Sequence, residues 1–182
     1  MLLVLVVLLA AGCSLGGDDQ PSPPAEAFRF PSWLDQTYTD GRITIRYPSD
    51  WTRGRSDRFG EYVDDATKIT AAFVGIRYLP RREYASHAEF ADLAAKLLRP
   101  PNGRGTTLEY TQAARIGGRL GVEALIIWAA DEDSPLGPKM SVYGVELDSG
   151  EVAILIFAAE NRTNHAGEFG WIKRSITWRL GG

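Results

Sequence analysis

Short runs of alternating apolar and polar residues recur along most of the chain, which is the pattern of half-buried β-strands. The clearest run is 42–47 (RITIRY), and the Asp40-Gly41 pair directly before it is a favoured two-residue hairpin turn. A longer run, 68–78 (KITAAFVGIRY), has apolar residues on both faces and ends before a proline. We therefore expect a hairpin near the start of the domain and a longer, more buried strand after it.

Four further strands are predicted in the second half of the chain, each joined to the next by a turn or loop. They are expected at 106–116, 119–130, 139–147 and 151–159. Strands joined in this way pair as an antiparallel meander. Residues 152–157 (VAILIF) are apolar on both faces, so the last of these strands is expected at the centre of the sheet.

Two amphipathic helices are predicted as well. Ser86 and Glu89 have the spacing of a capping box, and apolar residues follow on one helical face: Phe90, Leu93, Ala94 and Leu97. A second helix is expected to start near Thr163 or Asn164 and to present Phe169, Ile172 and Ile176 on one face. The pattern as a whole predicts an α+β fold, an antiparallel twisted sheet flanked by helices, in a single domain over 33–182.

The order of these elements, with residues 38–51 (YTDGRITIRYPSDW) and 175–178 (SITW), resembles the PsbP-like domains. That group includes the extrinsic photosystem II protein, LpqN-type actinobacterial lipoproteins and a small Ran-binding nuclear import factor. The resemblance implies an α/β/α sandwich. Because unrelated functions share this scaffold, the resemblance implies little about activity.

The first part of the chain is an uncharged apolar segment that is too short to span a membrane. As a helix, the apolar run from Leu2 to Ala11 would extend roughly 18 Å at 1.5 Å per residue, whereas the hydrocarbon core of a bilayer is ~30 Å thick. The residues that follow, 14–32, contain many Gly, Pro and Asp, which is typical of a flexible tether. An apolar run that ends in small residues is typical of a secretory signal peptide.

Residues 9–13 (LAAGC) resemble a bacterial lipobox. The resemblance implies cleavage by signal peptidase II between Gly12 and Cys13, with acyl chains such as palmitate attached at Cys13. Two or three acyl chains hold a protein stably on a membrane. The chain then divides into a signal peptide (1–12), a lipidated cysteine with its tether (13–32) and a globular domain (33–182). We expect this domain on the extracytoplasmic face of the cell membrane. The alternative is ordinary secretion with a free thiol.

Charge and composition narrow the classes of function. A formal net charge of −3 over 182 residues gives no sign of a basic nucleic-acid-binding face, so no nucleic-acid partner is expected. One cysteine and two histidines cannot form a disulfide framework or a cysteine-based zinc cluster, and no metal or other cofactor is expected. The sequence has no nucleophile motif and no glycine-rich phosphate loop, which predicts a protein without enzymatic activity.

Basic clusters are the main candidates for contact with a partner. They are expected in two loops, one with Arg53, Arg55 and Arg58 and the other with Arg81 and Arg82. Beside a membrane, such clusters can contact anionic lipid headgroups or an acidic partner. Because arginine is frequent throughout this chain, a background of solvated arginines is the alternative.

The remaining distinctive residues are expected to be structural. Trp51 follows the end of a strand and is expected to be buried at one end of the sandwich. His87 and His165 are expected to be exposed at helix starts, without a metal. The acidic groups are expected in solvated loops and not in calcium sites: Asp64, Asp65 and 131–133.

These features favour a membrane-anchored, non-enzymatic binding or assembly module for an envelope protein or ligand. One alternative is a carrier of a lipid or apolar molecule in a pocket between sheet and helix, with Phe73, Trp128 and Phe157 in its lining. A second is an enzyme that uses scattered acids such as Glu109 and Glu123. A third, in a photosynthetic host, is a photosystem-associated protein like PsbP.

Overall fold

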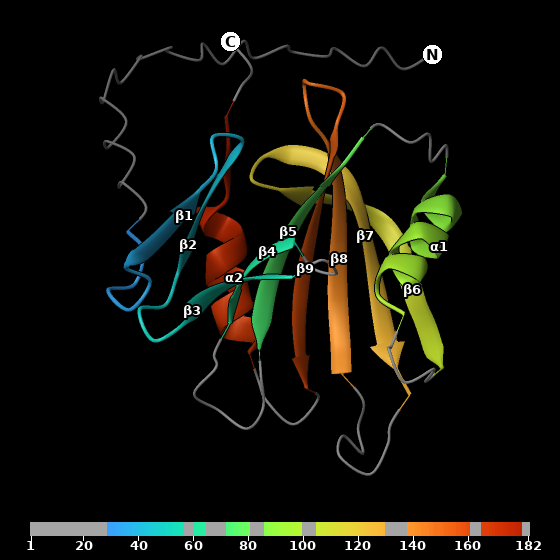
Figure 1. The fold of residues 1–182 in the computed structure, drawn as a ribbon, viewed down its shortest axis with the longest axis horizontal. Helices are drawn as coiled ribbons and strands as arrows, with labels where there is room; N and C mark the ends of the chain where they lie inside the picture. The colour runs from blue at the N-terminus through green and yellow to red at the C-terminus, as the bar shows by residue number, and fades with distance from the viewer. Residues whose placement is uncertain are drawn as a thin grey trace, which may run out of the picture.

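Two antiparallel sheets of unequal size and two helices make up the described part of this computed structural model (Figure 1). The structure describes residues 29–56, 60–64, 72–80, 86–99, 105–129, 138–160 and 165–179. The smaller sheet has the order β1 (Gln36–Thr39), β2 (Ile43–Tyr47), β10 (Thr177–Trp178). The larger sheet has the order β3 (Thr52–Ser56), β4 (Gly60–Asp64), β5 (Phe73–Leu79), β9 (Val152–Glu160), β8 (Pro138–Glu146), β7 (Arg119–Trp128), β6 (Thr106–Ile116). The helices are α1 (His87–Leu97) and α2 (Ala166–Ser175).

The predicted hairpin is confirmed and forms most of the smaller sheet. Its turn is stabilised by the Asp40 carboxylate, which accepts hydrogen bonds from the backbone N–H groups of Arg42 (2.9 Å) and Ile43 (3.1 Å). Gly41 has a φ of +87°, a conformation that glycine adopts without steric cost. β10 pairs with the other edge of β2, so the end of the chain completes the smaller sheet.

The predicted meander is also confirmed, as β6, β7, β8 and β9 with bounds close to those expected. β9 lies between β5 and β8, and its side chains from Val152 to Ala158 are buried on both faces, as the sequence predicts. β5 begins at Phe73, whereas residues 68–71 of the expected strand lie outside the described part of the chain.

The larger sheet is covered on both faces, which produces two separate hydrophobic cores. On one face α1 packs against β7, β8 and β9 through Phe90, Ala94 and the adjoining Leu98. The Phe90 ring approaches the sheet so closely that a Cβ at Gly144 would lie 2.3 Å from a ring carbon. The other face packs against α2 and the smaller sheet. The α+β fold with helices flanking the sheet is therefore confirmed, with a small second sheet added.

Local hydrogen bonds fix both ends of α1. The predicted N-cap at Ser86 is confirmed, because Ser86 Oγ accepts a hydrogen bond from the backbone N–H of Glu89 at 3.2 Å. At the other end, Trp128 Nε1 of β7 donates to the carbonyl of Leu98 at 2.8 Å. Neither helix of the described residues has the length and apolar character needed to cross a membrane.

α2 begins at Ala166, later than expected, and residues 161–164 lie outside the described part of the chain. Its last turn is attached to β2 by Ser175, whose Oγ accepts from the backbone N–H of Arg46 at 2.9 Å and donates to the carbonyl of Ile172 at 2.7 Å. Figure 1 shows α2 beside the smaller sheet, on the side of the larger sheet away from α1. The smaller sheet therefore has a fixed position against the larger one.

Candidate functional site

Arg53 and Arg55 lie in a strand, so the expectation that they belong to a loop is wrong. They are part of β3, which pairs with β4 in the register Arg53 with Val63 and Arg55 with Glu61. The sequence gives little sign of this strand because its side chains are polar on both faces. The lack of a side chain at Gly54 makes room for the pairing with β4, because a Cβ at residue 54 would lie 2.3 Å from the ring of Tyr62 on β4.

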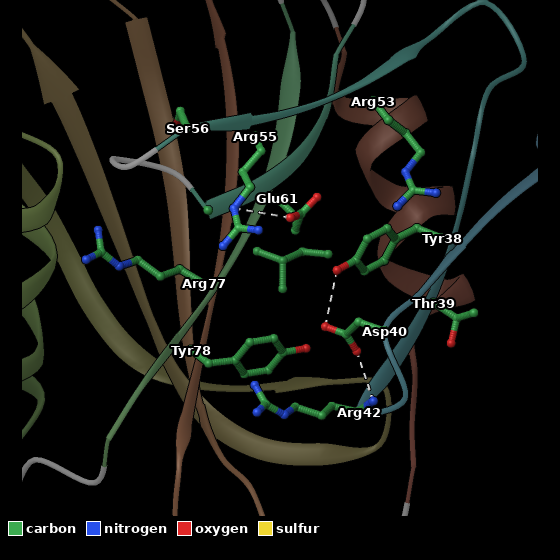
Figure 2. A pocket seen from close by; sticks show the side chains of 12 residues that line it. Tyr38, Thr39, Asp40, Arg42, Arg53, Arg55, Ser56, Glu61, Arg77 and Tyr78 are labelled. Atoms are coloured by element: carbon green, nitrogen blue, oxygen red, sulfur yellow. Dashed lines mark hydrogen bonds and ion pairs between the residues drawn. The ribbon is translucent and has the colours of Figure 1, made fainter.

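Arginine side chains gather in a cleft between the β1–β2 hairpin and the β3–β4–β5 edge of the larger sheet (Figure 2). Its volume is about 710 Å³ and it is open to solvent. We call it the arginine cleft, and define it by three arginines, two carboxylates and two phenols: Arg42, Arg53, Arg55, Asp40, Glu61, Tyr38 and Tyr78. The excess of guanidinium groups over carboxylates makes its lining positive at neutral pH.

Two of these guanidinium groups are held against aromatic rings. The guanidinium carbon of Arg53 lies 5.0 Å from the centroid of the Tyr38 ring, and that of Arg42 lies 4.3 Å from the Tyr78 ring. Contact through the guanidinium face leaves N–H groups at its edge available to an anion. Arg42 also pairs with Glu151 at 3.3 Å.

Arg55 forms an ion pair but remains largely exposed to solvent. It pairs with Glu61 at 3.5 Å, and its side chain is 82% exposed. Exposed pairs of this kind contribute little to stability, typically about 0–1 kcal/mol, because water and salt screen them. An incoming carboxylate can therefore compete for Arg55 at small energetic cost.

The Asp40 carboxylate lies in the cleft and already accepts several hydrogen bonds. Besides the two backbone N–H groups of the turn, it accepts a hydrogen bond from the Tyr38 hydroxyl at 3.2 Å. Burial acts to raise the pKa of Asp40, but the hydrogen bonds donated to the carboxylate outweigh it and hold the pKa below its ordinary value of 3.8. Asp40 is thus ionised at neutral pH and orients the hydroxyls around it.

The two phenols of the cleft remain protonated. Burial, reinforced by the nearby Asp40 carboxylate, raises the pKa values of both Tyr38 and Tyr78. The Tyr78 hydroxyl points towards Asp40 in Figure 2, yet it is buried without a hydrogen bond of normal geometry. The cleft therefore offers guanidinium N–H groups and neutral hydroxyls, a donor set that suits an anionic ligand.

A second polar cluster lies under α2, with Glu123 and Tyr143 buried at its centre, Lys173 half-buried and Gln112 exposed at its rim. The Glu123 carboxylate is buried and accepts hydrogen bonds from the Tyr143 hydroxyl and, at 2.9 Å, from Gln112 Nε2. Lys173 Nζ donates to the Tyr143 hydroxyl at 2.6 Å. Burial lowers the pKa of Lys173, against the opposite effect of Glu123. We call Gln112, Glu123, Tyr143 and Lys173 the buried polar network.

The sequence-predicted role of Trp51 is confirmed and that of His165 is wrong. Trp51 is 4% exposed and meets Phe169 edge to face, with centroids 6.4 Å apart. His165 is 6% exposed, and not on the surface as expected, because its ring packs against Phe169 at 6.0 Å and its Nδ1 meets the Glu168 carboxylate. His87 is the first residue of α1, and its side chain is not described.

The aromatic residues suggested as the lining of a carrier pocket belong to two different cores. Phe157 lies in the core beneath α2, whereas Phe73 and Trp128 pack against the core beneath α1. The sheet separates them, so they do not line one common cavity. Of the acids suggested for catalysis, Glu123 is held in the buried polar network and Glu109 lies at an irregularity in the edge strand β6.

Several predicted residues fall outside the described part of the chain: Gly12, Cys13, Arg58, Asp65, Arg81, Arg82 and 131–133. Asp64 is described and accepts a hydrogen bond from the Thr52 hydroxyl at 2.6 Å. Within the described ranges, no group of three or more His, Cys, Asp or Glu side chains is arranged to hold a metal ion.

The sequence matches no protein-family model, and no curated protein is similar enough in sequence to count as a match. Solved structures from several organisms share the fold. Cyanobacterial PsbP (CyanoP) from Synechocystis sp. PCC 6803 is 12% identical, with a TM-score of 0.60 over 79% of this chain and 92% of that chain. A protein from Bacteroides thetaiotaomicron VPI-5482 is 9% identical, with a TM-score of 0.53 over 82% of this chain and 50% of that chain.

The third structure is the Ran-binding protein Mog1p from Saccharomyces cerevisiae. It is 11% identical, with a TM-score of 0.51 over 76% of this chain and 90% of that chain. Identities this low show a shared fold and not a shared function. The described domain therefore has the PsbP-like fold.

Proposed function

We propose that this protein is a membrane-anchored binding module of the cell envelope that holds an acidic partner protein in the arginine cleft. The observation that carries the proposal is the convergence of Arg42, Arg53 and Arg55 on one open cleft. These arginines come from the β1–β2 turn and from β3, so the fold brings the Arg42 side chain to the same cleft as those of Arg53 and Arg55. The proposed activity is binding without catalysis.

The membrane anchor in this proposal is the lipidated Cys13. The lipobox-like residues 9–13 and the polar tether after them support it, and the tether gives the domain reach from the bilayer surface. An anchored domain meets partners in the same envelope compartment at a high effective concentration. Even a modest affinity of the cleft is then sufficient for association.

The fold is compatible with a binding role. The yeast protein of this fold is described as Ran-binding, which supports a binding module in the PsbP-like scaffold. The likeness to the cyanobacterial protein concerns the fold alone, and does not favour a photosystem-associated role over another envelope role.

The anchor is tested by fractionation of cells that express the full chain with Cys13→Ala. We expect the wild type in the membrane fraction with incorporated labelled fatty acid, and the variant in the soluble extracytoplasmic fraction without label. Retention of Cys13→Ala in the membrane, or a wild type that never acquires label, would show that the anchor is wrong.

The partner is tested by site-specific photocrosslinking in cells. A photoreactive amino acid is placed at Arg55 in the cleft and, as a matched control, at Arg115 on the opposite edge of the sheet. Arg55 and Arg115 are both exposed arginines on edge strands. We expect a specific envelope protein, identified by mass spectrometry, from the cleft position alone. Equal crosslinks from both positions would contradict the cleft as the partner site.

A further inference from the structure

We infer that the partner enters the arginine cleft as an extended acidic segment that adds to the open edge of β3, with its carboxylates facing Arg53 and Arg55. This inference rests on the proposed function and specifies how the partner is recognised. It follows from the position of β3 in the sheet, the face on which its arginines lie and the spacing between them.

β3 is an edge strand of the larger sheet among the described strands. It stands at the end of the order of the larger sheet, and β4 is the one described strand that pairs with it. An edge strand presents unpaired N–H and C=O groups to which an extended peptide can hydrogen-bond. The arginines that line this edge discourage pairing with neutral or basic strands and favour an acidic one.

The two faces of β3 differ, which determines which side chains of an added strand meet the arginines. Arg53 and Arg55 lie on the cleft face, as Figure 2 shows. Gly54 lies on the opposite face, where the Tyr62 ring covers it. Side chains of an added strand that lie on the cleft face therefore meet the arginines.

The spacing of the arginines matches that of side chains on one face of a neighbouring strand. Side chains on one face of a strand recur at every second residue, about 6.6–6.8 Å apart, and so do those of a neighbouring strand. Acidic residues at alternate positions of a partner segment would thus stand opposite both Arg53 and Arg55.

The opposite edge of the larger sheet is less suited to such a partner. β6 carries charges of both signs, Glu109 and Arg115, and its register is irregular between Leu108 and Tyr110. An irregularity of this kind interrupts the ladder that an added strand requires. Arg115 therefore provides the matched control for the arginines of β3.

The inference is tested by binding of fluorescent peptides to the full chain in detergent, measured by anisotropy. The acidic probe alternates Glu and Thr, and the comparison probes alternate Gln and Thr or Lys and Thr. We expect the acidic peptide alone to bind the wild type. The double variant Arg53→Glu, Arg55→Glu should weaken this binding by about tenfold or more, and Arg115→Glu should leave it unchanged. The double variant should gain affinity for the Lys-Thr peptide, a result that requires it to be folded.

Strand addition itself is tested with two further acidic peptides, N-methylated on alternate backbone nitrogens. The N–H groups of odd and even residues point to opposite edges of a strand. Methylation of one set should therefore abolish binding, and methylation of the other set should preserve it. Equal binding of both methylated peptides would overturn strand addition while the cleft remains an acidic-partner site.

Two outcomes would overturn the inference as a whole. One is equal binding of the acidic and Gln-Thr peptides, which would mean that the arginines merely protect the edge. The other is failure of the acidic peptide while inorganic phosphate or phosphatidylglycerol vesicles bind in an Arg53- and Arg55-dependent way. Failure of all peptides, together with an Arg55-specific crosslinked partner in cells, would reject strand addition and retain the proposed function.

Discussion

The arginine cleft and the buried polar network contain the same chemical groups in different surroundings. In the cleft, the Tyr38 hydroxyl donates to Asp40, and Arg53 lies over the Tyr38 ring. In the network, the Tyr143 hydroxyl donates to Glu123, and Lys173 Nζ lies 4.7 Å from the centroid of the Tyr143 ring. Each region thus combines a phenol, a carboxylate and a cation.

The difference between the two regions is access to water. Glu123 and Tyr143 are buried between α2 and the sheet, where an unmatched polar group is costly. Arg53 and Arg55 are exposed, so their interactions contribute little to stability and are available for exchange with a ligand. We conclude that the network holds α2 in place, whereas the cleft is free to bind. Removal of single oxygen atoms from the two regions tests this distinction.

The largest effect is expected for Tyr143→Phe. The substitution keeps the ring, which packs edge to face on Phe157 at 5.7 Å. It removes a donor to the buried Glu123 carboxylate and the acceptor for the half-buried Lys173 ammonium group. We expect a loss of about 2–4 kcal/mol in the free energy of unfolding, measured by urea denaturation.

The control for this prediction is the double variant Tyr143→Phe, Glu123→Gln. Glutamine at 123 removes the buried charge, and its amide can still interact with Gln112. We expect it to recover part of the stability that Tyr143→Phe loses. If Tyr143→Phe lowers the free energy of unfolding no more than a substitution at an exposed residue does, the network is as well solvated as the cleft.

An intermediate effect is expected for Tyr38→Phe in the cleft. The variant removes the hydrogen bond to Asp40, but that carboxylate keeps its two backbone donors in the turn. We expect a loss of about 1 kcal/mol in the free energy of unfolding, the usual contribution of one hydrogen bond. A loss as large as that of Tyr143→Phe would mean that the cleft carries as much structural energy as the network.

Sequence reasoning succeeded where the structural signal is local. The Asp40-Gly41 turn, the Ser86 cap and the apolar patterns of β6 to β9 are each encoded within a few neighbouring residues, and all were predicted. The β3–β4 hairpin was missed because its polar strands are defined by pairing across the hairpin and by the Tyr62 ring over Gly54. His165 was misplaced because side chains three and four residues later cover it.

The candidate site was predicted only in part for the same reason. Arg53 and Arg55 were identified as basic residues that could meet a partner, from their spacing in the sequence. Arg42 was not, because the smaller sheet brings it to the cleft through the tertiary fold. Tyr78 likewise reads as an ordinary strand residue until Arg42 is placed over its ring.

A small, pH-dependent effect is expected from Asp40. Its pKa in the folded protein lies below the ordinary value of 3.8, so the ionised carboxylate stabilises the fold above that value. This stabilisation is lost as the pH falls through the lower, folded-state pKa. Solvent screening reduces its size because the carboxylate is only partly buried.

The measurement is the difference in unfolding free energy between wild type and Asp40→Asn at several pH values. We expect the wild type to be more stable at pH 7, and the difference to shrink below about pH 4 as the carboxylate is protonated. A difference that is constant with pH would show that the ionised form of Asp40 has no special role in the turn.

The smallest effect is expected for Tyr78→Phe, which removes a buried hydroxyl that lacks a hydrogen bond of normal geometry. Removal of this hydroxyl loses little interaction energy and also removes the cost of burying it. The free energy of unfolding should therefore change by less than about 0.5 kcal/mol. The Tyr78 ring remains in place for Arg42 to lie over. If the hydroxyl is a spare donor for a ligand in the cleft, the same variant should weaken binding of the acidic peptide at unchanged stability. A loss of stability comparable with that of Tyr38→Phe would instead mean that Tyr78 is bonded to Asp40. This end of the cleft would then be as fully satisfied as the network under α2, and the contrast between the two regions would rest on the arginines alone.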